Sequence, residues 1–282
     1  LLGTFVTPRL HIRYAPWEKA VFRTSIGQGR RSANIFAENQ QLFASSRQIN
    51  IQSSNGKIYG LDPEVAWNYG VSFLQGFNFI GRPGDVTLDF YRTNFTNQVV
   101  VDWENPQQIS FYNLQGKSFA NSFQLEVNYS IVEGFNTRFA YKKYHIDTDY
   151  ISGKLSKPIT PNQRFFASTS YETEKGLDDQ QWKFDLTYNY IGQQRLPNTK
   201  SNPMPYQLTE RSSGYNLLNF QVTKVFSKRF EIYLGGENIT NVKQKNPILA
   251  SDNPFGNNFD STIIYSPIFG QMLYSGLRFK ID

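Results

Sequence analysis

The sequence predicts an all-β chain whose antiparallel strands cross a membrane as part of a β-barrel. About eleven segments alternate between apolar and polar residues, the period-two pattern of a strand with one apolar face. Aromatic residues make up 16% of the 282 residues, yet the mean hydropathy is only -0.50. This combination is typical of barrel strands, because half of each strand is polar. No apolar run of about 18 residues occurs, so the sequence encodes no transmembrane helix.

In length, the alternating segments are close to the roughly 9–11 residues that a tilted membrane strand needs. They are residues 7–14, 20–29, 63–73, about 86–100, 123–131, 135–142, 163–173, 182–190, 217–225, 230–237 and 273–281. The eighth segment is a clear example, because Trp182, Phe184 and Leu186 alternate with Lys183 and Asp185. We expect its apolar side chains to meet lipid and its polar side chains to face the lumen.

Connections between these segments alternate between short and long. Short connections fall near Pro16, Arg82, Gly134, Gly176 and Lys228. The connection near Arg82 is predicted as a turn over residues 76–84. Long connections begin near Arg30, Asp102, Asp147, Gly192 and Asn241. Outer-membrane barrels have short periplasmic turns and long extracellular loops, whereas a soluble β-sandwich has no reason for such alternation. We expect the proline-containing stretch 199–208 to be the tip of one long loop.

Several aromatic residues lie where membrane interfaces would be expected. They are Tyr129, Tyr141, Trp182, Tyr188 and Tyr190. An amphipathic ring suits the headgroup level of a bilayer, although aromatic residues also favour strands in general. Charged residues on the opposite faces should pair with one another or with material that fills the lumen. They are Arg138, Lys183, Asp185, Glu231, Glu237 and Arg278.

Motifs in the last fifty or so residues resemble the C-terminal hairpin of TonB-dependent outer-membrane receptors. They are Gly235-Gly-Glu-Asn-Ile-Thr-Asn241, Asn253-Pro-Phe-Gly-Asn-Asn-Phe-Asp260 and Tyr274-Ser-Gly-Leu-Arg-Phe279. Two earlier stretches, residues 27–38 and 60–70, are similar to other blocks of that family. One departure is the ending Phe279-Lys-Ile-Asp282, where many outer-membrane barrels end on an aromatic residue.

The resemblance implies that residues 1–282 are the C-terminal portion of one receptor barrel domain, with about 11 of 22 strands and the plug domain outside this segment. It also implies a receptor that binds a scarce nutrient, such as a metal chelate, cobalamin or a saccharide, at extracellular loops. Import would use the inner-membrane TonB complex, acting through the N-terminal part. The expected setting is the outer membrane of a Gram-negative bacterium, and the partners that the resemblance suggests are lipid, a small ligand and a surface lipoprotein.

Two other classes of function fit the same pattern. The chain could belong to a passive porin or to a structural barrel subunit of an outer-membrane complex. It could also belong to a barrel enzyme. A plug-filled lumen would separate the receptor from the porin, and hydrolysis of lipid or peptide would identify the enzyme.

The sequence offers few residues for cofactor or catalytic chemistry. Cysteine is absent, so disulfides and thiolate sites are excluded. His11 and His145 are the only histidines, and they could join Asp147 or Asp149 in a metal site. A lumen-facing position for His11 and a rim position for His145 is the simpler interpretation. We therefore assign no catalytic, cofactor-binding or metal residues, and the substrate-binding residues stay unassigned.

The sequence also disfavours two further classes of function, dinucleotide-dependent or hydrolytic enzymes and nucleic-acid-binding proteins. Gly27-Gln-Gly-Arg-Arg-Ser32 is not followed by a helix pattern, so it is not a dinucleotide-binding loop, and no G-x-S-x-G motif occurs. The net charge is +6, but the basic residues are scattered, with pairs such as Arg30-Arg31 and Lys142-Lys143. A nucleic-acid groove would cluster them, so we expect no nucleic-acid partner.

Overall fold

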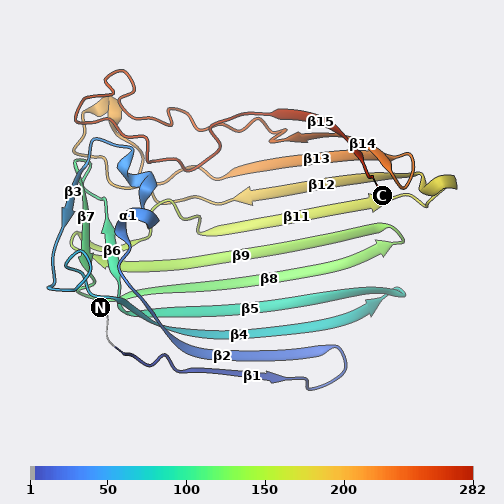
Figure 1. The fold of residues 1–282 in the computed structure, drawn as a ribbon, viewed down its shortest axis with the longest axis horizontal. Helices are drawn as coiled ribbons and strands as arrows, with labels where there is room; N and C mark the ends of the chain where they lie inside the picture. Colours follow the sequence, from blue (N-terminus) through green and yellow to red (C-terminus); the bar gives the residue numbers. More distant parts are fainter. Residues whose placement is uncertain (1–3, 282) are drawn as a thin grey trace.

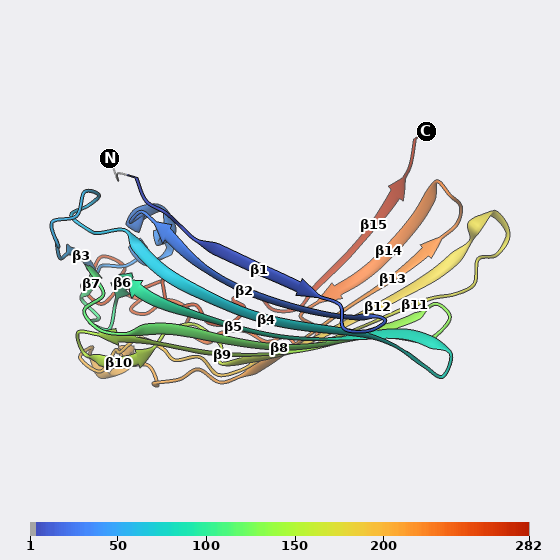
Figure 2. The same cartoon turned by 90° about the horizontal axis from the view of Figure 1, so that it is seen from below.

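The computed structural model describes residues 4–281, so expectations about Asp282 lie outside the described residues. Its main feature is one curved antiparallel sheet, called the wall here (Figures 1 and 2). Its strands are β1 Arg9–Tyr14, β2 Ala20–Arg31, β4 Glu64–Phe79, β5 Arg82–Asn97, β8 Ser118–Val132, β9 Phe135–Tyr150, β11 Gln163–Glu172, β12 Gln181–Ile191, β13 Tyr215–Val225, β14 Phe230–Glu237 and β15 Met272–Phe279. Short β10, Gly153–Ser156, pairs with β9 off this path. Each of the eleven predicted segments corresponds to one strand of the path, which confirms the predicted all-β barrel architecture.

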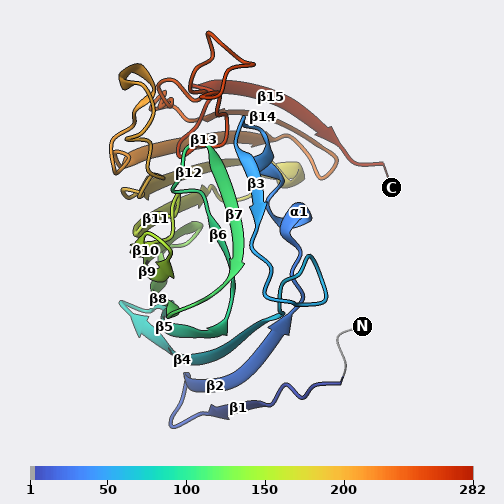
Figure 3. The ribbon, with the colours of Figure 1, turned by 90° about the vertical axis from the view of Figure 1, so that its left-hand side faces the viewer.

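The wall does not close on itself. Each strand pairs with its neighbours in chain order, while among the described residues β1 pairs only with β2 and β15 only with β14. Seen from one end in Figure 3, the strands form an arc that is open on the side of β1 and β15. Both outer edges therefore present backbone groups that lack a strand partner.

The cross-strand register gives the wall one apolar and one polar face. Apolar side chains line up across seven strands in the row Phe22, Phe73, Leu88, Leu125, Tyr141, Phe165 and Tyr190. On the other face Arg138 pairs with Glu126 at 2.9 Å and Lys183 with Glu172 at 3.3 Å. Arg278 also pairs with Glu231. Pairing within the predicted set of lumen charges is thus confirmed only for Arg278 and Glu231. Arg138 and Lys183 pair instead with Glu126 and Glu172, which the prediction did not include.

The short connections gather at one end of the wall, called the turn end. Between β4 and β5 the turn is only Ile80-Gly81, both with positive φ (49° and 69°). Consecutive positive φ values are typical of two-residue hairpin turns that match strand twist. The prediction of a turn over residues 76–84 was therefore too long, since most of that range continues the two strands.

Aromatic side chains form a row near the turn end. Rings of Phe135 and Tyr171 lie 6.1 Å apart, those of Tyr171 and Phe184 6.3 Å apart, and those of Phe184 and Trp182 6.2 Å apart. Trp182 is 43% exposed although it belongs to the apolar face. The row has the composition of an interfacial girdle. Of the predicted girdle residues, Trp182 and Tyr129 lie toward this end of their strands, Tyr188 and Tyr190 lie toward the other end, and Tyr141 lies near the middle of β9.

The long connections gather at the opposite end, called the loop end, and contain structure of their own. A three-stranded sheet of β3 Gln48–Ile51, β7 Gln108–Asn113 and β6 Val99–Asp102 lies inside the arc of the wall (Figure 3). Helix α1 Ile35–Glu38 and 3-10 helices Gln40–Phe43 and Met204–Tyr206 also belong there, while the 3-10 helix Leu177–Asp179 lies at the turn end.

These elements correct two predictions. The strand expected over residues 86–100 ends at Asn97, because Val99–Asp102 leaves the wall and pairs with β7. The loop expected over 102–108 is mainly the connection within this β6–β7 hairpin. The neighbouring strand β3 pairs with β7 in parallel over a long chain separation, so local sequence carried no sign of it.

Candidate functional site

Five long connections at the loop end pack into one folded unit, which we call the cap: residues 32–63, 98–117, 151–162, 192–214 and 238–271. Its core contains Ala33, Ile35, Leu42, Leu61, Val99, Trp103, Ile109, Phe111, Leu196, Leu249 and Ile263. Ile109 and Phe111 are fully buried, and partly buried Ile159 adds the third connection. Burial of apolar side chains from every connection fixes the loops against one another.

A buried ion pair ties the first connection to the fifth. Arg47 Nη2 and Asp260 Oδ2 lie 2.9 Å apart, and the two side chains are 1% and 6% exposed. Arg47 Nη1 donates to the carbonyl oxygens of Trp103 at 2.6 Å and Asn105 at 2.9 Å. Asp260 Oδ1 accepts from the Thr262 N–H at 2.8 Å. Because partners surround both charged groups, the desolvation cost of the pair is largely offset.

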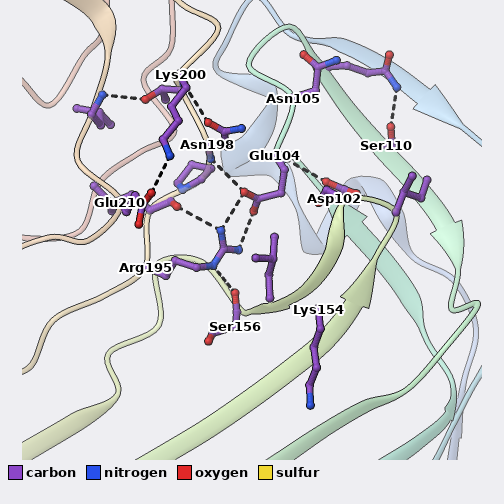
Figure 4. A pocket seen from close by; sticks show the side chains of 18 of the residues that line it. Asp102, Glu104, Asn105, Ser110, Lys154, Ser156, Arg195, Asn198, Lys200 and Glu210 are labelled. Atoms are coloured by element: carbon purple, nitrogen blue, oxygen red, sulfur yellow. Dashed lines mark hydrogen bonds and ion pairs between the residues drawn. The ribbon is translucent and has the colours of Figure 1, made fainter.

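A second ion pair lies in a cavity of about 970 Å³ between the second, third and fourth connections (Figure 4). Arg195 binds Glu104 with two bonds, Nη2 to Oε1 at 2.7 Å and Nη1 to Oε2 at 2.9 Å. Arg195 Nε donates to the Ser156 carbonyl at 2.5 Å, and the Asn198 N–H donates to Glu104 Oε2 at 3.1 Å. This bidentate geometry holds the cavity wall in one arrangement.

Most charges around the cavity are already matched. Lys200 Nζ lies 2.7 Å from Glu210 Oε1, and this hydrogen bond lowers the pKa of the Glu210 carboxyl below its usual range. Lys154 Nζ lies 3.6 Å from Asp147 Oδ2. The remaining lining is rich in amides and hydroxyls: Gln52, Asn105, Gln108, Ser110, Ser152, Ser156, Asn198, Thr199 and Thr209. Such a lining can hydrogen-bond a polar ligand without demanding a particular net charge.

Tyr112 anchors the small sheet beside this cavity. Its hydroxyl donates to Asp102 Oδ2 at 2.8 Å and accepts from the Ile151 N–H at 3.1 Å. Burial is the main reason why the pKa of the Tyr112 hydroxyl is raised well above its ordinary value, and the Asp102 carboxylate adds to the rise. The protonated hydroxyl therefore acts as a fixed donor between β6, β7 and the third connection.

A second cavity of about 710 Å³ lies between the small sheet and wall strands β8 and β9. Its lining includes Val99, Trp103 and Tyr150 together with the acidic residue Glu64. Glu64 pairs with Arg31 and accepts the Val99 N–H at 3.1 Å through its Oε1 atom. This cavity belongs to the junction between cap and wall.

The two histidines lie on different strands of the wall, β1 and β9. His11 lies exposed on β1. His145 Nε2 lies 3.1 Å from Asp147 Oδ2 on β9, while Asp149 accepts the Lys117 N–H at 2.7 Å. Among residues 4–281 no group of three or more His, Cys, Asp or Glu side chains is placed to hold a metal ion.

The residues that organise the cap were not singled out from the sequence. Arg47 and Asp260 are separated by 213 positions and Glu104 and Arg195 by 91, so no local spacing could reveal them. Thr199 to Leu208 is also not a free loop tip. Thr199 is 2% exposed, its Oγ1 accepts the Leu208 N–H at 2.8 Å, and Leu208 packs against the cap core.

Solved structures with a similar fold include receptors and a transporter. They include the ferric-catecholate import receptor Fiu from E. coli K12 (TM-score 0.61, 13% identity, covering 96% of this chain and 34% of that chain). The copper transporter OprC has a TM-score of 0.70 at 11% identity, covering 97% of this chain and 39% of that one. The siderophore receptor PiuA from Acinetobacter baumannii has a TM-score of 0.64 at 15% identity, covering 97% and 36%. At these identities the likeness shows the fold alone, and the chain spans at most 39% of these proteins.

Sequence comparison gives the family. No curated protein sequence matches the chain at a significant level. No helix among the described residues is long and apolar enough to cross a membrane. The profile of the TonB-dependent receptor-like β-barrel matches residues 3–239, and this family consists of outer-membrane receptors. Because the match covers most of the chain and agrees with the fold, the chain belongs to the TonB-dependent receptor β-barrel family.

Proposed function

We propose that residues 1–282 form the C-terminal half of the barrel of a TonB-dependent receptor in a Gram-negative outer membrane. The observation that carries this proposal is the combination of a wall with an exposed apolar face and a folded cap at one end only. A half-barrel alone would leave two unpaired edges in lipid, where each unsatisfied backbone group costs several kcal/mol. The other barrel half would therefore pair with β1 and β15.

In this proposal the turn end faces the periplasm and the cap faces the outside of the cell. The cap binds a scarce nutrient, such as a metal chelate, cobalamin or a saccharide, in the cavity around Arg195 and Glu104. Amide and hydroxyl groups of the lining supply hydrogen bonds, while the ion pair keeps them in place. The TonB complex acts on the plug, which fills the lumen, and a surface lipoprotein is a further proposed partner. The chain carries out binding and transport, and we assign it no catalysis.

Uptake measurements test this proposal. Cells with the full-length protein are given candidate nutrients with and without an uncoupler of the proton-motive force. We expect saturable uptake that stops on uncoupling. Flux that survives uncoupling and rises linearly with solute would contradict the receptor and favour a porin, and stable assembly with envelope proteins without any flux would favour a structural subunit.

A pair of glutamine variants tests the position of the site. Gln108→Ala removes a side-chain amide that lines the cavity, whereas Gln115→Ala removes an exposed amide elsewhere in the cap. We expect Gln108→Ala to raise the half-saturating nutrient concentration several-fold, since a lost hydrogen bond costs about 1 kcal/mol. Equal effects of the two variants would contradict binding in this cavity.

A further inference from the structure

Four basic side chains gather on the apolar face of the wall near the loop end, and we call them the outer cation cluster: Arg92 on β5, Lys143 and His145 on β9, and Lys154 on β10. The register places Arg92 opposite Asn121 of β8, and Asn121 opposite His145. Leu88, Phe90 and Phe123 belong to the same face, so these cations interrupt a surface that is otherwise apolar. They come from neighbouring strands around β8 (Figure 1).

Phe119 forms the centre of this cluster. The Arg92 guanidinium carbon lies 4.8 Å from the centre of the Phe119 ring, and Lys154 Nζ lies 5.4 Å from it. The His145 ring meets the Phe119 ring edge to face at 5.3 Å. Two amides orient Arg92, since its Nε donates to Asn94 Oδ1 at 2.8 Å and its Nη1 to Asn121 Oδ1 at 3.1 Å. The guanidinium is therefore held in place by neutral groups.

The cluster has more positive than negative charge in contact. Asp147 is shared by His145 at 3.1 Å and Lys154 at 3.6 Å. Within residues 4–281, by contrast, Arg92 and Lys143 form no ion pair with a carboxylate. Two cations without a carboxylate match the charge of about -1.5 to -2 that a phosphate monoester carries at neutral pH.

The height of the cluster on the wall matches the headgroup level of a membrane. Phe135 belongs to the aromatic row at the turn end, and His145 lies ten residues farther along β9 (145 − 135). A strand with a tilt of about 40° converts these ten residues to a height of roughly 25 Å. The apolar band of an outer-membrane barrel is also about 25 Å tall. One membrane thickness therefore separates the aromatic row from the cations.

We propose that the outer cation cluster binds the phosphate group of a lipid in the outer leaflet, of the phosphorylated glycolipid class to which lipid A belongs. Basic side chains on the lipid face are costly at the midplane of the bilayer but are tolerated at the interface, and a phosphate there supplies the missing counter-charge. Arg92 and Lys143 contact the phosphate, while Phe119 packs beside the acyl chains. This inference rests on the membrane placement in the proposed function.

Lipid titration of the purified, delipidated full-length protein, followed by native mass spectrometry, tests the cluster. The probes are bisphosphorylated lipid A, dephosphorylated lipid A and phosphatidylglycerol. We expect lipid A to bind best and Arg92→Gln or Lys143→Gln to weaken its binding about tenfold, because each removes a charge-assisted contact. Lys142→Gln is the matched control, since Lys142 lies next in the chain on the opposite face, with its Nζ 4.9 Å from the Tyr144 ring. We expect no change in lipid A binding for this variant.

Three results would overturn the assignment: equal binding of dephosphorylated lipid A, equal binding of phosphatidylglycerol, or equal losses for Lys142→Gln and Lys143→Gln. Uptake measured on the same variants separates this inference from the proposed function. If the protein does not distinguish phosphorylated from dephosphorylated lipid A but energised uptake is intact, only the lipid-binding role of the outer cation cluster is contradicted. Intact lipid A selectivity without energised uptake contradicts the receptor function alone.

Discussion

In the wall, large apolar side chains such as Leu186 and Phe184 remain 45% and 41% exposed on one face, whereas in the cap Ile109 and Phe111 are completely buried. The wall keeps its polar pairs on the opposite face, and the cap keeps two ion pairs inside. A sheet whose apolar side faces outward suits a lipid solvent. A set of loops that buries its apolar side chains in a core of its own suits an aqueous environment.

This difference bears on the ligand binding that we propose for the cap. Long loops are usually mobile and acquire order by packing or on binding. Here the five connections carry a core and two buried ion pairs of their own. A preorganised site avoids the entropic cost of ordering loops on binding. The cap therefore resembles a small water-soluble domain attached to a membrane sheet.

The strongest test of this comparison is to leave a buried charge without its partner. Arg47→Ala should lower the free energy of unfolding of the cap by about 3–5 kcal/mol, because Asp260 would stay buried and unpaired. The wall should remain folded. Limited proteolysis should then cut the cap while the barrel keeps its strand content by circular dichroism. Lys57→Ala, an exposed position in the same connection, is the control, and equal protease resistance of the two variants would contradict a cap held by this pair.

In the wall the corresponding test introduces a charge instead. Leu186→Arg should reduce the free energy of unfolding in a bilayer by about 2–4 kcal/mol if the residue lies near the midplane. Thr187→Arg, one residue farther and on the opposite face, should have a much smaller effect because it points to the polar side. Denaturant unfolding in lipid vesicles gives both values. Similar losses at the two positions would indicate a water-exposed sheet.

The pH dependence of cap stability should be a smaller effect than that of either substitution. Because the pKa of the Tyr112 hydroxyl is raised in the folded state, an unfolded chain loses this proton first, at its ordinary pKa near 10. The stabilisation is thus complete below about pH 10 and declines as pH rises through the folded pKa, by at most about 1.4 kcal/mol per pH unit. Tyr112→Phe should remove this decline in cap stability measured by hydrogen exchange. An unchanged alkaline decline in that variant would assign it to another group.

The smallest effect is expected at an exposed ion pair of the cap. Lys200 and Glu210 lie 2.7 Å apart, but their side chains are 72% and 79% exposed. Exposed pairs contribute little to stability because water and salt screen them, so Lys200→Gln should leave the cap as resistant to protease as the wild type. A loss comparable to that of Arg47→Ala would mean that burial does not decide which pairs matter.

The same contrast explains what the sequence could predict. In wall strands such as 182–190 apolar and polar residues alternate, because successive side chains point to opposite faces of the sheet. Strand β3 has no such signal, since its partner β7 follows about sixty positions later and the pairing is parallel. Arg47 likewise looks like any residue of a polar loop until Asp260 is brought beside it. Local periodicity thus predicts the wall, and only tertiary contacts define the cap and its cavity.

Hydrogen–deuterium exchange of the ligand-free full-length protein tests the central claim most directly. If the cap is folded in advance, backbone amides of β3, β6 and β7 should be protected for minutes to hours, in the range of wall strands β12 and β13. Exposed positions such as Lys57 and Tyr59 provide an internal reference for fast exchange. Complete exchange of β6 and β7 within seconds, with protection appearing only after a ligand is added, would contradict a cap that is organised before binding.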